Sequence, residues 1–310
     1  MRTLRRALTL VTVSAAALAG QLVAPPAPAA YPGVNGRLTF TSPHNGVLQI
    51  FTINDDGTGK NRITDPPRFN YNPFYNADAS MIYFATQMPN GTSNVFSMLP
   101  SGLLRTQITT SQHRQYVNPS ISPDGTKIIT VGIHPNGQQD LYMMNSNGTG
   151  ITRFTNTDGN EDDPSFSPGG GEIVYSRETP KASGFIVIQD VSGAPSMRLT
   201  PKDGNAYDPS FDPTGTMVAY SKETGAQGAT QRIFKVNTDG TGNMKIADTP
   251  AKEVWFHPVY APDGARIAAI KLGQGNNVNR IVTMDAADGL NRFRVTDQNV
   301  DPIDVDWGVD

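Results

Sequence analysis

Six steps of a polar residue followed by proline recur along this chain, and their side chains could bind a cation. The residue before each proline carries a carboxylate, an amide or an imidazole: Asn72, Asn118, Asp163, Asp208, His257 and Asp301. Carboxylate and amide oxygens suit calcium, and an imidazole suits a transition metal. If the fold brings the steps together, we expect calcium or another divalent metal to be held by four of them, namely Asp163, Asp208, His257 and Asp301. The alternative is that these polar residues begin turns and hydrogen bond to loop backbone groups.

The segments that lead into these steps carry aromatic and cationic side chains, which suit a binding surface. We predict ligand binding by seven of them: Arg68, Tyr71, His113, Tyr116, Tyr207, Trp255 and Phe256. Aromatic and arginine side chains dominate the binding energy of many interfaces, and functional residues often lie on loops that a rigid scaffold holds. The alternative is that these rings pack inside the fold, between its repeating units.

The chain contains no local motif for catalysis, so we predict no catalytic residue. It has no cysteine, which excludes thiolate nucleophiles, thiolate metal sites and disulfides. The Gly-x-Ser-x-Gly elbow and the His-Glu-x-x-His pair are both absent from the sequence. Two function classes stay open: a binding module without catalysis, and a metal-assisted enzyme of the lyase or lactonase type.

The polar–proline steps belong to a repeat of about 45 residues, which is typical of a β-propeller with one blade per repeat. Each repeat holds four short runs that are rich in β-branched and aromatic residues. In one copy these runs are 164–167, 172–175, 186–188 and 198–200. No segment after residue 30 shows sustained apolar spacing of 3.6 residues, so we expect almost no helix there.

The repeats are offset at the two ends of the chain. The first begins at its second strand, near Arg37, and the last ends on a proline strand from Asp301 to Trp307. The C-terminal strand must therefore complete the first blade, which closes the ring and removes an exposed sheet edge. The predicted fold is an all-β, six-bladed β-propeller with a 3+1 terminal clasp. The loops that lead into the proline strands then ring one mouth of a central channel, where either function would be placed.

Three motifs of the repeat can be compared with known families. They are Asp-Pro-Ser-Phe-Ser-Pro at 163–168, Ile-x-Tyr-Ser at 173–176 with Arg-Leu-Thr at 198–200, and the Asp-Gly-Thr-Gly turn at 239–242. Together they resemble the WD40-like (PD40) repeats of the TolB family, from about Gly36 to Asp310. The resemblance implies an exported six-bladed propeller that binds a partner. TolB also carries an α/β domain before its propeller, which we do not expect here, so its lipoprotein partner is not carried over.

The N-terminus has the pattern of a secretory signal peptide. A basic start that includes Arg5 and Arg6 precedes an apolar run over 7–20, and alanines follow it. We expect residues 1–30 to be a cleaved signal peptide and residues 31–310 to form the propeller domain. The protein would then be secreted, periplasmic or held in the cell envelope, with Sec and Tat export both open.

The composition limits the class of partner. The chain has 25 Lys and Arg against 28 Asp and Glu, a net charge of −3, so nucleic-acid binding is not expected. No later apolar run approaches the roughly 18 residues of a membrane span. We expect a monomer that binds an envelope or extracellular protein segment or a glycan. No cofactor is predicted apart from the metal considered above.

Overall fold

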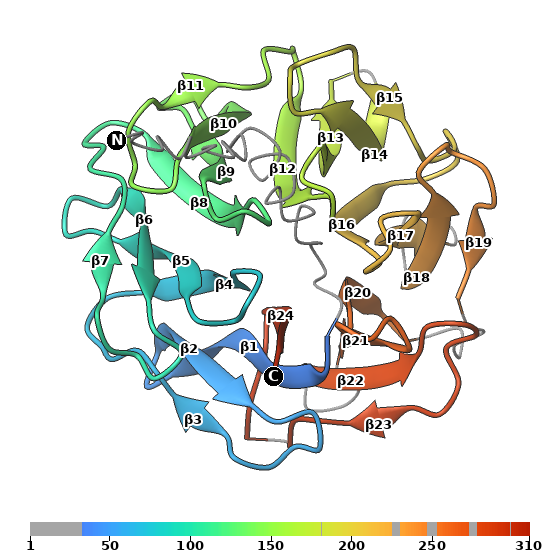
Figure 1. The fold of residues 1–310 in the computed structure, drawn as a ribbon, viewed down its shortest axis with the longest axis horizontal. Coiled ribbons are helices and arrows are strands. Elements are labelled where there is room, and N and C mark those ends of the chain that lie inside the picture. The colour runs from blue at the N-terminus through green and yellow to red at the C-terminus, as the bar shows by residue number, and fades with distance from the viewer. Residues whose placement is uncertain (1–32, 181, 225–229, 247–252, 273–277, 298) are drawn as a thin grey trace, which may run out of the picture.

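The protein forms a ring of six blades around a central axis (Figure 1). The computed structural model describes residues 33–180, 182–224, 230–246, 253–272, 278–297 and 299–310. The predicted signal peptide lies outside these residues. The described chain builds six four-stranded antiparallel sheets, one per blade. The prediction of an all-β, six-bladed propeller is therefore confirmed.

Each blade runs from an innermost strand on the axis to a two-residue strand at the rim. The innermost strands, from the first blade to the sixth, are β24 (Asp304–Val309), β4 (Asn70–Tyr75), β8 (Gln115–Ile121), β12 (Asn160–Phe166), β16 (Ala206–Phe211) and β20 (Trp255–Tyr260). The second strands are β1 (Asn35–His44), β5 (Ile82–Gln87), β9 (Lys127–Ile133), β13 (Glu172–Thr179), β17 (Met217–Thr224) and β21 (Arg266–Lys271). The third strands are β2 (Val47–Ile53), β6 (Ser93–Met98), β10 (Gln139–Asn145), β14 (Ala182–Asp190), β18 (Thr230–Asn237) and β22 (Arg280–Asp285). The rim strands are β3 (Asn61–Arg62), β7 (Thr106–Gln107), β11 (Thr152–Arg153), β15 (Met197–Arg198), β19 (Met244–Lys245) and β23 (Phe293–Arg294).

The C-terminal strand closes the ring. β24 pairs with β1, so the first blade has the order β24-β1-β2-β3 and joins both ends of the described chain. Its register places Trp307 opposite Leu38 and Asp304 opposite Thr41. The expected clasp is confirmed, but its strand begins at Asp304 and not at Asp301.

A bulge interrupts five of the six innermost strands at the polar–proline step. The pairing register shifts at this step in β4, β8, β12, β16 and β20. The residue before each proline has a positive φ, between 48° and 52°, and these residues are Asn72, Asn118, Asp163, Asp208 and His257. Asparagine, aspartate and histidine are the non-glycine residues most enriched in this left-handed conformation. Because a bulge reorients its side chain, these five polar groups face the axis.

The threonine that follows the rim strand in the repeat has a structural role. In five blades the threonine hydroxyl accepts a hydrogen bond from the backbone N–H of the third strand, at 2.8–3.1 Å. The threonines are Thr64, Thr109, Thr155, Thr200 and Thr296. The rim strand has only two residues, and this bond fastens the chain beyond it to the blade. The repeated threonine is therefore a structural residue.

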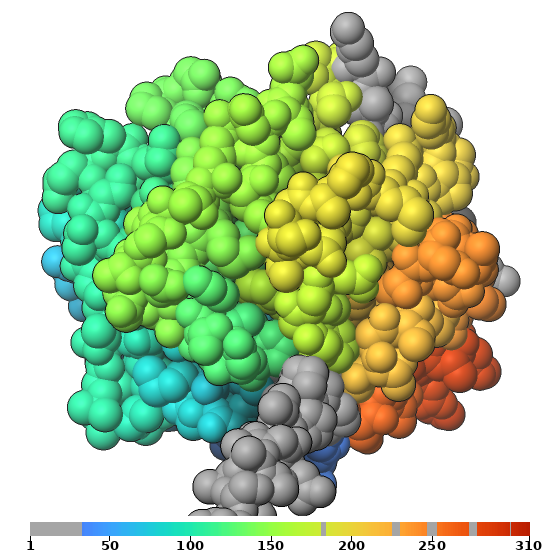
Figure 2. All heavy atoms as spheres, turned by 45° about the horizontal axis from the view of Figure 1, so that its top comes forward, coloured from blue at the N-terminus to red at the C-terminus, as the bar shows by residue number. Residues whose placement is uncertain are grey.

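The hydrophobic core lies between the blades and not within any one of them. The cluster around Trp307, for example, joins Leu38 and Val305 of the first blade to Val259 and Ile281 of the sixth. The space-filling view shows neighbouring blades in direct contact on one face of the molecule (Figure 2). Among the described residues, no helix is long and apolar enough to cross a membrane.

Replacing Trp307 with alanine should lower the free energy of unfolding by about 3–5 kcal/mol. The indole is buried between the first and last blades, and its Nε1–H donates to the carbonyl of Gly36 at 3.2 Å. Its loss leaves a cavity where the ring of blades closes. Urea unfolding monitored by circular dichroism measures the change. The matched control is Phe293→Ala, which removes a rim aromatic that is 45% exposed. A loss below about 1 kcal/mol at Trp307, close to the range usual for surface substitutions, would show that the indole is not buried where the ring closes.

Candidate functional site

A small cavity on the axis is the candidate site. Its volume is about 90 Å³, and every innermost strand contributes to its lining. The five left-handed residues at the bulges line it, and β24 adds Asp304 and Asp306. The cavity thus collects two amides, one imidazole, the hydroxyls of Ser165 and Ser210, and the carboxylates of Asp163, Asp208, Asp304 and Asp306.

Asp301 is not part of this group, which corrects the sequence prediction. β24 has no register shift between Asp304 and Trp307, so the last blade copy contains no bulged proline step. Asp301 lies before the strand and accepts a hydrogen bond from the backbone N–H of Asn279 at 2.8 Å. The Asp-Pro pair at 301–302 resembles the repeated step, but strand pairing identifies a different residue. Trp307 pairs with Leu38 as Phe166 pairs with Ile173. Asp304 precedes Trp307 by three residues, as Asp163 precedes Phe166, so Asp304 takes the place of Asp163 in this blade.

Hydrogen bonds join the channel residues of the third and fourth blades. The side-chain amide of Asn118 donates to Asp162 at 2.6 Å and to Asp163 at 2.9 Å. Asp162 precedes the bulge, where the other blades carry the large apolar residues Tyr71, Val117, Tyr207 and Phe256. Asp162 was not among the predicted site residues, although it is the one acid at this position of the five bulged repeats.

Asp208 connects the fifth and sixth blades. Its carboxylate accepts a hydrogen bond from the hydroxyl of Ser221 at 2.7 Å and from the backbone N–H of His257 at 3.0 Å. The imidazole Nδ1 of His257 lies 3.8 Å from the same carboxylate. The pair therefore brings an acidic and a basic side chain together on the axis.

The two carboxylates of the clasp bind backbone groups of the first and second blades. Asp304 accepts the N–H of Thr41 at 2.7 Å and that of Asn72 at 3.1 Å. Asp306 accepts the N–H of Tyr75 at 2.7 Å. These hydrogen bonds connect β24 to β1 of its own blade and to β4 of the second blade. The same two residues therefore close the ring and line the channel.

The channel is a poor environment for negative charge. Desolvation raises the pKa of Asp162, and it raises the pKa of Asp163 well above the usual range, with a further rise from the charges of Asp162 and Asp208. Burial also raises the pKa of Asp304, although the nearby His257 opposes the rise. Burial raises the pKa of Asp306 to about 6. A positively charged group that enters the cavity would relieve this repulsion.

The described residues do not fit the predicted metal site. No group of three or more His, Asp or Glu side chains among them is arranged so that it could hold a metal ion. Asp163, Asp208 and His257 do meet in the channel, but Asp301 lies apart. Backbone N–H groups already occupy oxygens of Asp208 and Asp304.

Two of the seven predicted ligand-binding residues are buried between blades. Tyr116 is 4% exposed and packs edge-on against Tyr142, with ring centroids 5.8 Å apart. Trp255 is 1% exposed and belongs to the cluster between the fifth and sixth blades. Their position, two residues before the left-handed residue, is buried in the other bulged blades too, at Asn70, Glu161 and Ala206. Neither ring can contact a ligand at the channel mouth.

The other five residues keep some exposure. Tyr71 is half-buried and its hydroxyl hydrogen bonds to Ser93. Tyr207 and Phe256 are also half-buried, and desolvation raises the pKa of Tyr207 to about 12. Arg68 and His113 are exposed. These five remain available for contact with a partner, whereas the channel carboxylates form the more compact site.

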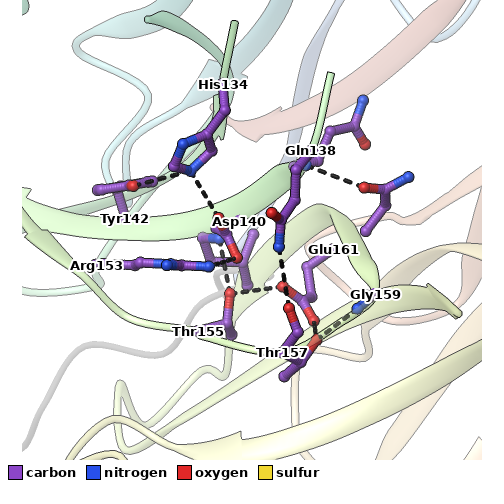
Figure 3. Close-up of polar contacts among 12 residues, drawn as sticks. His134, Gln138, Asp140, Tyr142, Arg153, Thr155, Thr157, Gly159 and Glu161 are labelled. Atoms are coloured by element: carbon purple, nitrogen blue, oxygen red, sulfur yellow. Dashed lines mark hydrogen bonds and ion pairs between the residues drawn. The ribbon is translucent and has the colours of Figure 1, made fainter. Parts of the chain in front are cut away.

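A second polar cluster lies where the third blade meets the fourth (Figure 3). The buried Asp140 accepts a hydrogen bond from Arg153 at 2.6 Å, and its other oxygen lies 2.7 Å from Nε2 of His134. The hydroxyl of Thr155 donates to the buried Glu161 of the next blade at 2.7 Å. The pairing of Asp140 with His134 resembles an acid–base dyad, but its neighbours connect strands and none of them lines the channel. We interpret the cluster as a set of ion pairs and hydrogen bonds that hold the third and fourth blades together.

This ring of four-stranded blades, closed by its last strand around a polar channel, places the protein among the β-propellers. A family model described as the TolB beta propeller domain (PD40) matches residues 9–182 and 107–309, so the chain belongs to that family. A search of curated proteins returned no match to the sequence.

Solved structures agree with the fold. TolB from Acinetobacter baumannii has a TM-score of 0.74 at 17% identity, with 89% of this chain and 67% of that chain covered. A chain of a nidogen/laminin complex has a TM-score of 0.68 at 10% identity, with 88% and 99% covered. An oligogalacturonate lyase from Vibrio parahaemolyticus has a TM-score of 0.59 at 14% identity, with 86% and 77% covered. At these identities the likeness shows the fold alone.

The stability of an Asp306→Asn variant relative to the wild type should rise with pH. The folded pKa of Asp306, about 6, lies above the ordinary value of 3.8. The stability that this carboxyl contributes is therefore present below about pH 4 and lost as the pH rises through about 6. Asparagine avoids that loss and can still accept the N–H of Tyr75. The gain should approach about 3 kcal/mol at pH 8.

Urea unfolding of both proteins at pH 4, 6 and 8 provides the measurement. Asp158→Asn is the matched control, because Asp158 is exposed. Its stability relative to the wild type should be the same at all three pH values. If the free energy of unfolding of Asp306→Asn relative to the wild type is also the same at all three pH values, the carboxylate of Asp306 is freely accessible to water.

Proposed function

We propose that this protein is an exported binding module, without catalytic activity of its own, that receives a segment of a partner protein at the mouth of its channel. The observation that carries the proposal is the convergence of Asp163, Asp208 and Asp304 on one small cavity. Membership of the TolB propeller family supports a binding role. The signal-peptide pattern at residues 1–30 supports export.

The charge of the cavity favours a cationic group on the ligand. Desolvation, with a smaller contribution from neighbouring carboxylates, raises the pKa of Asp162 and Asp163. A lysine, an arginine or an amino terminus would favour the ionised state and gain charge-assisted hydrogen bonds. A protein segment fits this requirement better than a neutral glycan, which offers no positive charge.

The exposed residues around the channel suit a peptide partner. Arg68 and His113 are exposed, and Tyr71, Tyr207 and Phe256 are half-buried. Tyrosine and phenylalanine offer contact area at a small cost in side-chain entropy. The cationic group would enter the channel, and these side chains would contact the rest of the segment.

A non-catalytic role fits the chemistry of the channel. Its only imidazole, His257, lies beside the carboxylate of Asp208, and no residue of the cavity lining carries an activated nucleophile. The described residues also lack the metal-binding group that a metal-assisted lyase or lactonase requires. We therefore favour recognition over catalysis.

The double variant Asp163→Asn, Asp208→Asn should lose the partner. Removing two carboxylates removes the attraction for a cationic group, and loss of a close charge pair weakens binding by about tenfold or more. The measurement is affinity capture from an envelope extract, with captured proteins quantified by mass spectrometry. A peptide from the captured protein is then titrated calorimetrically, beside a copy in which glutamine replaces its lysines and arginines.

Two controls make the result specific. Asp239→Asn removes an exposed carboxylate from the turn between β18 and β19, where the third blade carries Asn147, and should retain the partner as the wild type does. The thermal midpoint of the double variant should not fall, because the substitutions relieve like-charge repulsion. Equal capture by the wild type and the double variant, or equal binding of the charged and neutral peptides, would refute the proposal.

A further inference from the structure

The sixth blade holds a second cavity that shares no lining residue with the channel. Its volume is about 370 Å³, which lies within the usual range for small-molecule pockets, about 300–1,000 Å³. The charged residues that the structure describes in its lining are four cations and one acid, namely Lys271, Arg280, Arg292, Arg294 and Glu253, and Trp255 lies beside them. A pocket with this excess of positive charge is unexpected in a chain whose net charge is −3.

Strand register explains why these cations gather. Lys271 lies between Trp255 on one neighbouring strand and Arg280 on the other. Arg294 pairs with Val282, which is two residues beyond Arg280 and therefore points to the same face of the sheet. The antiparallel sheet thus places one lysine and two arginines on a single face.

The only acid among the described residues of the lining, Glu253, already has two partners. Oε1 of Glu253 lies 2.5 Å from the ammonium of Lys271, and Oε2 accepts a hydrogen bond from Nε1–H of Trp255 at 3.0 Å. Glu253 therefore neutralises one cation and leaves the three arginines. Among the described residues, no Asp or Glu forms an ion pair with any of the three.

Two of the arginines are held in place by uncharged groups. Arg280 donates to the carbonyl of Val278 at 2.9 Å. Arg292 donates from Nε to the carbonyl of Gly289 at 3.0 Å, and its guanidinium lies 5.3 Å from the ring centre of Trp255. Each of these contacts uses part of the guanidinium fork and leaves other N–H groups to bind a ligand.

We propose that this pocket binds a multivalent oxyanion, either a phosphorylated or a polycarboxylate ligand, through Arg280, Arg292 and Arg294. Arginine presents a planar fork of N–H donors that matches carboxylate and phosphate oxygens. Three arginines without acidic partners, on a pocket of this size, call for a ligand with at least two negative groups. The site is separate in position and in charge from the acidic channel.

Calorimetric titration of the protein at low salt tests the site with two probes, inorganic pyrophosphate and citrate. At least one should bind and weaken as salt is added. Stronger binding of pyrophosphate assigns a phosphorylated ligand, and stronger binding of citrate assigns a polycarboxylate. Arg294→Gln should weaken binding by about tenfold or more, since it removes a charge-assisted contact.

The repeat supplies a matched control for Arg294→Gln. Arg62 occupies the same position on the rim strand of the first blade, but it pairs with Asp65 at 2.7 Å. Arg62→Gln removes the same charge and should leave binding unchanged within about twofold. Both arginines lie at the rim, so circular dichroism should show that each variant folds. Absence of binding by both probes at millimolar concentration, or equal losses in the two variants, would overturn the proposal.

Discussion

The left-handed residue before each bulge proline is the constraint from which the site follows. A positive φ at a non-glycine residue is tolerated best by asparagine, aspartate and histidine, and these are the residues found at all five bulges. The same geometry turns their side chains toward the axis. The backbone therefore requires polar side chains where six strands meet, and the propeller acquires a polar channel as a result of how its inner strands are built.

Ring closure adds charge to this channel. β24 has no bulge, so its polar side chains reach the axis by strand alternation. Asp304 and Asp306 satisfy backbone N–H groups of Thr41, Asn72 and Tyr75, which makes them part of the closure. Their burial also raises both pKa values. Closure of the ring and the acidic lining of the channel thus depend on the same two carboxylates.

The period of the repeat and its offset at the two ends were sufficient to predict the blades and the clasp, because those features depend on alternating apolar residues and turn chemistry that recur along the chain. The family was predicted from the resemblance of the motifs at 163–168, 173–176, 198–200 and 239–242. Asp163, Asp208 and His257 meet in the channel as expected, because the bulge backbone favours residues of their types, but they do not form the predicted metal site. Residue-level predictions failed where two features share one residue type. Asp301 precedes a proline as the bulge residues do, and only the pairing of Trp307 shows that it lies outside the strand. Tyr116 and Trp255 are aromatic in sequence, and burial between blades cannot be read from residue type.

Positions that vary from blade to blade add charge to the polar frame that the repeat provides. Asp162 stands where other blades place a large apolar side chain and adds a carboxylate beside the channel. The residue before the buried aliphatic position of the third strand is Gln49, Asn94 and Asp140 in the first three blades, and it is arginine in the fifth and sixth, at Arg232 and Arg280. A fold shared this widely does not specify a function, so specificity must come from such positions. Opposite charges are separated among the described residues, with acids on the axis and three arginines that lack an acidic partner on the sixth blade, and one ligand chemistry cannot satisfy both.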